Sequence, residues 1–132
     1  MIFDTTSTMS EFISLLLITL MLIILDFVWF SFSLESIYKP TFELVQGSPL
    51  EMRIAGGIIA WFLIAEGIRY LIKPADYTSA ATGGALLGLV VYGVYNATNY
   101  ATFKNYPAST AFADTAWGMF VCAVGAVVSS AV

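Results

Sequence analysis

FISLLLITLMLIILDFVWFSFS, residues 12–33, is the stretch that decides how this chain folds. An α-helix needs about 20 mostly apolar residues to cross the hydrocarbon core of a bilayer. This stretch is long enough to do so, and Asp26 is its single charged residue. It therefore predicts a transmembrane helix that carries a carboxyl group inside the membrane.

Three further stretches have similar length and apolar character. They are IAGGIIAWFLIAEGIRYLI at 54–72, AATGGALLGLVVYGVYNATNYAT at 80–102 and AFADTAWGMFVCAVGAVVSSA at 111–131. Of the 132 residues, 59% are hydrophobic and only 11% are charged, and the mean hydropathy is +0.86. A water-soluble domain needs more charge than this to cover its surface. We predict a single all-α domain over residues 1–132, an integral membrane bundle of four transmembrane helices.

The connections between these spans predict how the helices are arranged. Residues 34–53 contain two prolines and five charged residues, and we expect them to form a long loop at the membrane interface. The connections at 73–79 and 103–109 are short, and each contains a proline that stops the helical pattern. Short connections make the second, third and fourth helices antiparallel neighbours.

Composition also excludes several classes of function. The net charge is −4 and there is no histidine, so the chain lacks the basic surface that binds nucleic acid. The single cysteine, Cys122, cannot form an internal disulfide or a zinc site, and we interpret it as small packing filler. The sequence contains no nucleotide loop, metal-ligand spacing or catalytic motif, so it predicts no cofactor and no metal, and gives no ground for predicting an enzyme.

Four polar side chains inside these spans are predicted to lie at a similar depth. Asp26 is seven residues before the end of the first span, and Asp114 is in the first turn of the fourth. Asn96 and Asn99 are in the last two turns of the third span. At 1.5 Å per residue, all four lie within roughly 5 to 11 Å of the same membrane boundary. An aspartate inside a span costs about 2.5 to 3.5 kcal/mol on insertion scales, so each should face the bundle and find a partner there.

Aromatic side chains accompany these polar residues. Each aspartate is followed at i+3 by a tryptophan, and residues three apart share a helix face. Two tyrosines lie one turn from the two asparagines, and a third tryptophan lies near the same depth in the second span. We therefore predict a polar and aromatic pocket. Its residues are Asp26, Trp29, Trp61, Tyr92, Tyr95, Asn96, Asn99, Asp114 and Trp117.

Two interpretations of this cluster are open at the level of sequence. Polar side chains between membrane helices can serve only to hold the helices together, each contributing roughly 0.6 to 2 kcal/mol. Alternatively, they anchor a ligand between tryptophan walls. Because two like charges in one dry pocket repel, we expect at least one aspartate to be protonated and to donate to the other or to Asn99. An asparagine should then replace that aspartate with the fold preserved.

Two other patterns have structural interpretations. Glu66 is followed at i+3 by Arg69, which predicts an ion pair within the second helix that takes no part in the pocket. Small residues repeat at four-residue spacing on the third and fourth helices, and such faces permit close packing within one chain or in a homo-oligomer. These faces are Gly84 with Gly88, and Gly118 with Cys122 and Ala126.

The basic residues give an orientation. Lys39, Arg53 and Lys104 lie on the side of the first and third connections, whereas Arg69 and Lys73 lie on the other side. Cytoplasmic segments carry the excess of lysine and arginine. Three against two predicts that both termini are on the non-cytoplasmic side.

Three classes of function are compatible with these features. The first is binding of a lipid or another apolar small molecule in the predicted pocket, with membrane lipids as the surrounding partners. The second is a small transporter coupled to protons or to another cation. The third is a structural component of a membrane, including a viral envelope.

The sequence also resembles a family of membrane proteins. DFVW at 26–29, YKP at 38–40, GALLGLVVYGVYNATNYAT at 84–102, YP at 106–107 and DTAWG at 114–118 are similar, in this order, to the family called domain of unknown function 2177, or DUF2177. That family usually has an aspartate where this chain has Asn96 and a tryptophan where it has Tyr106. The resemblance implies a four-helix integral membrane protein and implies no particular reaction.

Overall fold

The computed structural model describes residues 5–132, and this part of the chain contains helices and no strand. Four of its helical units are long and apolar enough to cross a membrane, which confirms the predicted fold class. The first unit is continuous from Thr5 to Gln46. The elements are α1 (Thr5–Ser33), the π-helical turn η1 (Leu34–Tyr38), α2 (Lys39–Gln46), α3 (Ile54–Leu71), α4 (Tyr77–Thr102) and α5 (Ala108–Ala131).

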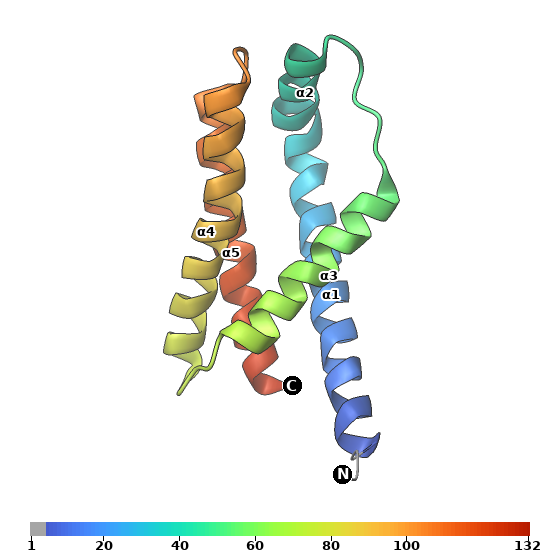
Figure 1. Cartoon of the computed structure of the whole chain (residues 1–132), viewed down its shortest axis with the longest axis vertical. Helices are drawn as coiled ribbons and strands as arrows, with labels where there is room; N and C mark the ends of the chain where they lie inside the picture. Colours follow the sequence, from blue (N-terminus) through green and yellow to red (C-terminus); the bar gives the residue numbers. More distant parts are fainter. Residues whose placement is uncertain (1–4) are drawn as a thin grey trace.

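The helices form a pair, α4 with α5, packed beside the long α1–η1–α2 unit (Figure 1). α3 crosses α1 obliquely, and the lower end of α3 in this view reaches α5. The start of α1, the C-terminal end of the chain and the turn between α3 and α4 lie at one end of the bundle, called here the terminal end. α2 and the turn between α4 and α5 lie at the opposite end, called here the loop end.

The first helix does not stop at Ser33 as predicted, and Pro40 explains how it continues. Proline has no N–H, and its ring clashes with the carbonyl four residues earlier in a regular α-helix. η1 ends two residues before this proline and widens the helix, with the Lys39 N–H donating to the carbonyl of Leu34. The helix ends only at Gly47, whose φ of 73° is left-handed and suits a residue without a Cβ. The predicted long loop is therefore reduced to residues 47–53.

The α3–α4 turn is shaped by a capping box. The Asp76 carboxylate accepts from the backbone N–H of Ser79 at 2.7 Å, and the Ser79 hydroxyl accepts from the Asp76 N–H at 3.0 Å. The hydrogen bond from the Ser79 N–H lowers the pKa of the Asp76 carboxyl group. Together, the two hydrogen bonds satisfy two N–H groups at the start of α4 and so define where that helix begins.

Glycine lets α4 and α5 touch backbone to backbone. A Cβ on Gly84 would lie 2.3 Å from the carbonyl oxygen of Cys122, and one on Gly88 would lie 2.3 Å from that of Gly118. Both small-residue faces are thus buried against each other within one chain. This occupies the surfaces that the sequence also offered for a homo-oligomer, so an oligomer would have to use other residues.

The core runs between α1, α3 and α5. Ile18 and Leu22 on α1, Ile68 on α3, and Val121 and Cys122 on α5 are all at most 1% exposed. Large apolar side chains on the outer faces of these helices remain exposed, as expected for surfaces in contact with lipid chains.

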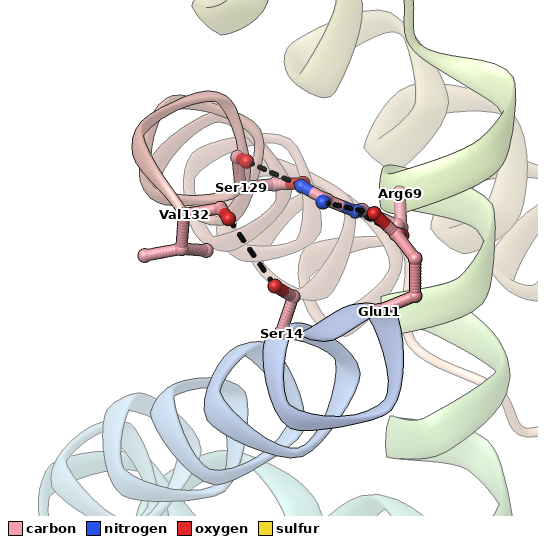
Figure 2. A network of polar contacts seen from close by, with 5 residues as sticks. All are labelled: Glu11, Ser14, Arg69, Ser129 and Val132. Carbon is pink, nitrogen blue, oxygen red and sulfur yellow. Dashed lines mark hydrogen bonds and ion pairs between the residues drawn. The ribbon is translucent and has the colours of Figure 1, made fainter. Parts of the chain in front are cut away.

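The predicted ion pair between Glu66 and Arg69 is wrong, because Arg69 reaches across the terminal end to other helices (Figure 2). Its guanidinium binds the Glu11 carboxylate on α1 through two hydrogen bonds, of 2.9 and 2.8 Å. A third, of 2.8 Å, goes to the carbonyl of Ser129 on α5. The Ser14 hydroxyl also donates to the carbonyl of Val132. These contacts join three helices, which a pair within α3 would not do.

Replacing Gly88 by alanine tests the α4–α5 contact. The new methyl group would collide with backbone atoms of α5, so the two helices must separate, at a cost of roughly 1 to 3 kcal/mol. Gly93 on the same helix is the matched control, because the nearest atom to a Cβ there is 3.7 Å away. We expect Gly88→Ala, and not Gly93→Ala, to lower the free energy of unfolding measured by denaturant titration in mixed micelles. Equal effects would contradict this packing.

Candidate functional site

A cavity of about 400 Å³ lies between the helices near the loop end. Its wall draws on α1, η1, α2, α3, α4 and α5, and on the segment before α3. Most lining side chains are aromatic or aliphatic, and two are aspartates. The lining residues are Asp26, Trp29, Phe30, Leu34, Tyr38, Phe42, Leu50, Met52, Gly57, Ala60, Trp61, Ile64, Val91, Tyr92, Tyr95, Tyr106, Asp114 and Trp117.

Asp26 joins three helices through its two oxygens. It lies on α1 and is 6% exposed. Trp61 on α3 donates its indole N–H to Oδ2 at 2.5 Å, and Trp117 on α5 donates to Oδ1 at 2.6 Å. An indole nitrogen is only a donor, so both carboxylate oxygens act as acceptors. This single side chain therefore links α1, α3 and α5.

Asp114 on α5 is the centre of a second set of hydrogen bonds. The Tyr38 hydroxyl donates to Oδ1 at 2.5 Å, and the Asn96 amide donates to Oδ2 at 2.6 Å. Tyr38 itself accepts from the indole N–H of Trp29 at 2.9 Å, which leaves its own proton for Asp114. Asp114 thus links α5 to η1 and α4.

The amide of Asn96 is held in one orientation from both ends. Its nitrogen also donates to the carbonyl of Tyr92 at 2.8 Å, and its oxygen accepts from the Tyr106 hydroxyl at 2.6 Å. Burial raises the pKa of Tyr106, so that hydroxyl keeps the proton it donates. These contacts direct the amide N–H toward Asp114.

A stacked pair of indoles connects the two sets. The rings of Trp29 and Trp117 have centroids 4.9 Å apart and planes only 6° from parallel. Trp29 belongs to the Asp114 set and Trp117 to the Asp26 set. Together with Trp61, they are the chain's three tryptophans, and each donates its N–H within this cluster.

Two local features position aromatic residues of the cavity wall. Gly118 lies under Tyr92, and a Cβ on Gly118 would be 2.1 Å from the Tyr92 ring. Thr41 on α2 and Thr110 on α5 share a buried hydrogen bond of 2.6 Å. This bond fastens α2 to α5 and so holds the preceding turn, with Tyr38, over the cavity.

The predicted hydrogen bond from one aspartate to the other or to Asn99 is wrong. Within the described part of the chain, Asp26 accepts from two indoles, and Asp114 accepts from a phenol and an amide. An asparagine at either position would place its amide N–H against one of these donors. The expected tolerance of asparagine therefore does not follow from this geometry.

Seven of the nine predicted pocket residues line the cavity, and the two asparagines do not. Asn96 is 1% exposed and lies behind Asp114, to which it is bonded. Asn99 lies beside Tyr106, at the edge of the cluster.

Sequence reasoning missed the contribution of the chain between 34 and 53. Tyr38, Phe42, Leu50 and Met52 line the cavity, although they fall in the stretch interpreted as an interfacial loop. Pro40 was the available signal, because a proline inside a helix can be accommodated by a π-helical turn.

The charged side chains that line the cavity are all acidic. Among the described residues that line the cavity, two are acidic and none is basic. Residues 5–132 contain no group of three or more His, Cys, Asp or Glu side chains placed to hold a metal ion. The site is therefore an aromatic cavity with two acidic acceptors.

Tyr38→Phe tests the assignment of this residue to the cluster. Loss of the hydroxyl leaves Oδ1 of Asp114 and the N–H of Trp29 without their partner, so we expect a loss of about 1 to 3 kcal/mol of unfolding free energy. Tyr100→Phe is the control, because Tyr100 is 58% exposed and its hydroxyl has no hydrogen bond to the described residues. Thermal unfolding in detergent measures both variants. Similar midpoints for the two would refute the assignment.

Comparison with known proteins places the chain in a family. The family model described as "Predicted membrane protein (DUF2177)" matches residues 11–131, which include the whole cluster. No curated protein and no solved structure matches the chain. The match covers nearly the full length, and its description agrees with the four helices that can span a membrane. The protein belongs to the DUF2177 family of predicted membrane proteins.

Proposed function

We propose that this membrane protein binds a lipid or another apolar small molecule in the cavity between its helices. The observation that supports the proposal is a cavity of about 400 Å³ with a mostly aromatic wall and two aspartates. Pockets for small molecules have volumes of about 300 to 1,000 Å³ and combine apolar walls with a few placed polar groups. This cavity has both properties.

The wall is also held in place before any ligand arrives. The three tryptophans and Tyr38 are each fixed by a hydrogen bond to the cluster. A wall that is already ordered loses less conformational entropy on binding. Tyr92 and Tyr95 also line the cavity, and their hydroxyls have no hydrogen bond to the described residues, so they are available to a ligand.

A purely structural role explains the hydrogen bonds less completely. Protein interiors are densely packed and contain few voids larger than a water molecule. Polar residues that only held helices together would be expected to sit in a closed interface. Here they surround a space large enough for a ligand.

Intrinsic fluorescence provides a direct test, because all three tryptophans line the cavity. An alkanol with a terminal bromine atom quenches indole fluorescence on contact. We expect it to quench the protein in lipid nanodiscs with a saturable dependence on its mole fraction. Gly57→Leu, which fills the cavity beside Trp61, should weaken this binding about tenfold or more.

Gly56→Leu is the matched control for that variant. Gly56 is the neighbouring residue on α3, it does not line the cavity, and a Cβ there meets nothing within 4 Å. Both variants make the same chemical change on the same helix. Quenching that is not saturable, or that is equal in both variants and the wild type, would count against the proposed function.

We further propose that the loop end faces the cytoplasm and both termini face away from it. Lys39, Arg53 and Lys104 near the loop end outnumber Arg69 and Lys73 near the terminal end. The excess of lysine and arginine marks the cytoplasmic side.

Single cysteines on a Cys122→Ala background test this orientation. Ala75 and Asn105 are exposed positions in turns at opposite ends of the bundle. In intact cells, a membrane-impermeant thiol reagent should label Ala75→Cys directly and Asn105→Cys only after permeabilisation. The reverse pattern would overturn the orientation.

A further inference from the structure

We infer that the ligand of this cavity carries a protonated amine, which donates hydrogen bonds to Asp26 and Asp114 while its apolar part lies against the aromatic wall. The inference rests on the ligand-binding function proposed above. It follows from the hydrogen-bond acceptors of the cavity wall that have no further donor, and from the lack of a positive charge beside them, within the described part of the chain.

The aspartates retain acceptor capacity. An ionised carboxylate offers about four lone-pair sites, and each aspartate here receives two donors from the protein. Both side chains line the cavity. Each can therefore accept further hydrogen bonds from a group inside it.

Most hydrogen-bond donors of the cavity wall already have an acceptor within the protein. The N–H groups of all three tryptophans donate within the cluster, as do the hydroxyls of Tyr38 and Tyr106. The remaining donors to a ligand are the hydroxyls of Tyr92 and Tyr95. A hydroxyl or carbonyl group on a ligand can use these two, but the wall as a whole offers more acceptors than donors.

No cation from the described wall balances the two acids. The ion pairs in residues 5–132 join Lys39 to Glu35 and Arg69 to Glu11, and none of these four residues lines the cavity. A carboxylate or phosphate ligand would add a further negative charge beside two acids in a partly desolvated site, where like charges repel strongly. An ammonium group instead supplies the missing counter-charge.

The aromatic wall favours the same ligand. A cation within about 6 Å of an indole face is attracted by the ring quadrupole, and tryptophan is the best partner for this interaction. Trp29, Trp61 and Trp117 all line the cavity next to the aspartates. The wall thus combines acceptors for the N–H groups with faces that suit both the charge and an alkyl chain.

A head-group series tests the inference. Three bromine-tagged probes of equal chain length, an alkylamine, an alkanol and an alkanoate, are titrated into the protein in nanodiscs of uncharged lipid. We expect the amine to bind about tenfold or more tightly than the alkanol, with the alkanoate weakest. Asp26→Asn and Asp114→Asn should each lower the ratio of amine affinity to alkanol affinity.

Glu66→Gln controls for the loss of a negative charge as such. It removes a carboxylate from α3 that does not line the cavity, so the order and spacing of the three affinities should stay as in the wild type. If neither aspartate variant folds, the head-group series on the wild-type protein still tests whether the ligand carries an amine.

The outcomes separate the two proposals. If the alkanol or the alkanoate binds as tightly as the amine, and Gly57→Leu blocks that binding, the inferred amine is wrong and the ligand-binding function stands. If no probe quenches saturably, the proposed function itself fails.

Discussion

The structure depends on satisfying two carboxylates inside a membrane bundle. An aspartate in a span is costly unless donors from neighbouring helices reach it. Asp26 obtains them from α3 and α5, and Asp114 obtains them from η1 and α4. Every helical unit that crosses the bundle therefore contributes to one of two sets of hydrogen bonds, and the stacked rings of Trp29 and Trp117 join the two sets. Because each contact requires a particular side chain at a particular height, this set defines how the helices are positioned along one another.

Close packing in one place leaves space in another. Gly84 and Gly88 let α4 and α5 meet at their backbones, whereas α3 crosses α1 obliquely and has only Ala65 and Ile68 fully buried. Near the loop end, large rings held by hydrogen bonds separate these elements. Flat rigid side chains that are fixed at one edge cannot collapse to fill the space between them, and this accounts for a cavity beside a densely packed helix pair. The Arg69 contacts hold the opposite end together.

Much of the candidate site could be anticipated from residue type and depth. The length of the apolar runs indicated how many helices cross the membrane, and the rise per residue brought Asp26 and Asp114 to one level. Tyr38 was not anticipated, because it lies in a π-helical turn, and Pro40 by itself does not decide between such a turn and the end of the helix. The partner of Arg69 could not be anticipated either. A long flexible side chain can reach several acids, and the proximity of Glu11 depends on how α1 packs on α3.

The sequence by itself determined that lipid surrounds this protein, how many transmembrane helices it has and how deep its polar residues lie in the membrane. These properties follow from local composition and from distance along a helix, so they need no knowledge of neighbours. The tertiary structure alone decided which donor meets which carboxylate, whether the small-residue faces are used within the chain, and that a cavity remains between the rings. Those properties depend on the rotation and crossing angle of each helix against the others, which packing of the whole bundle sets.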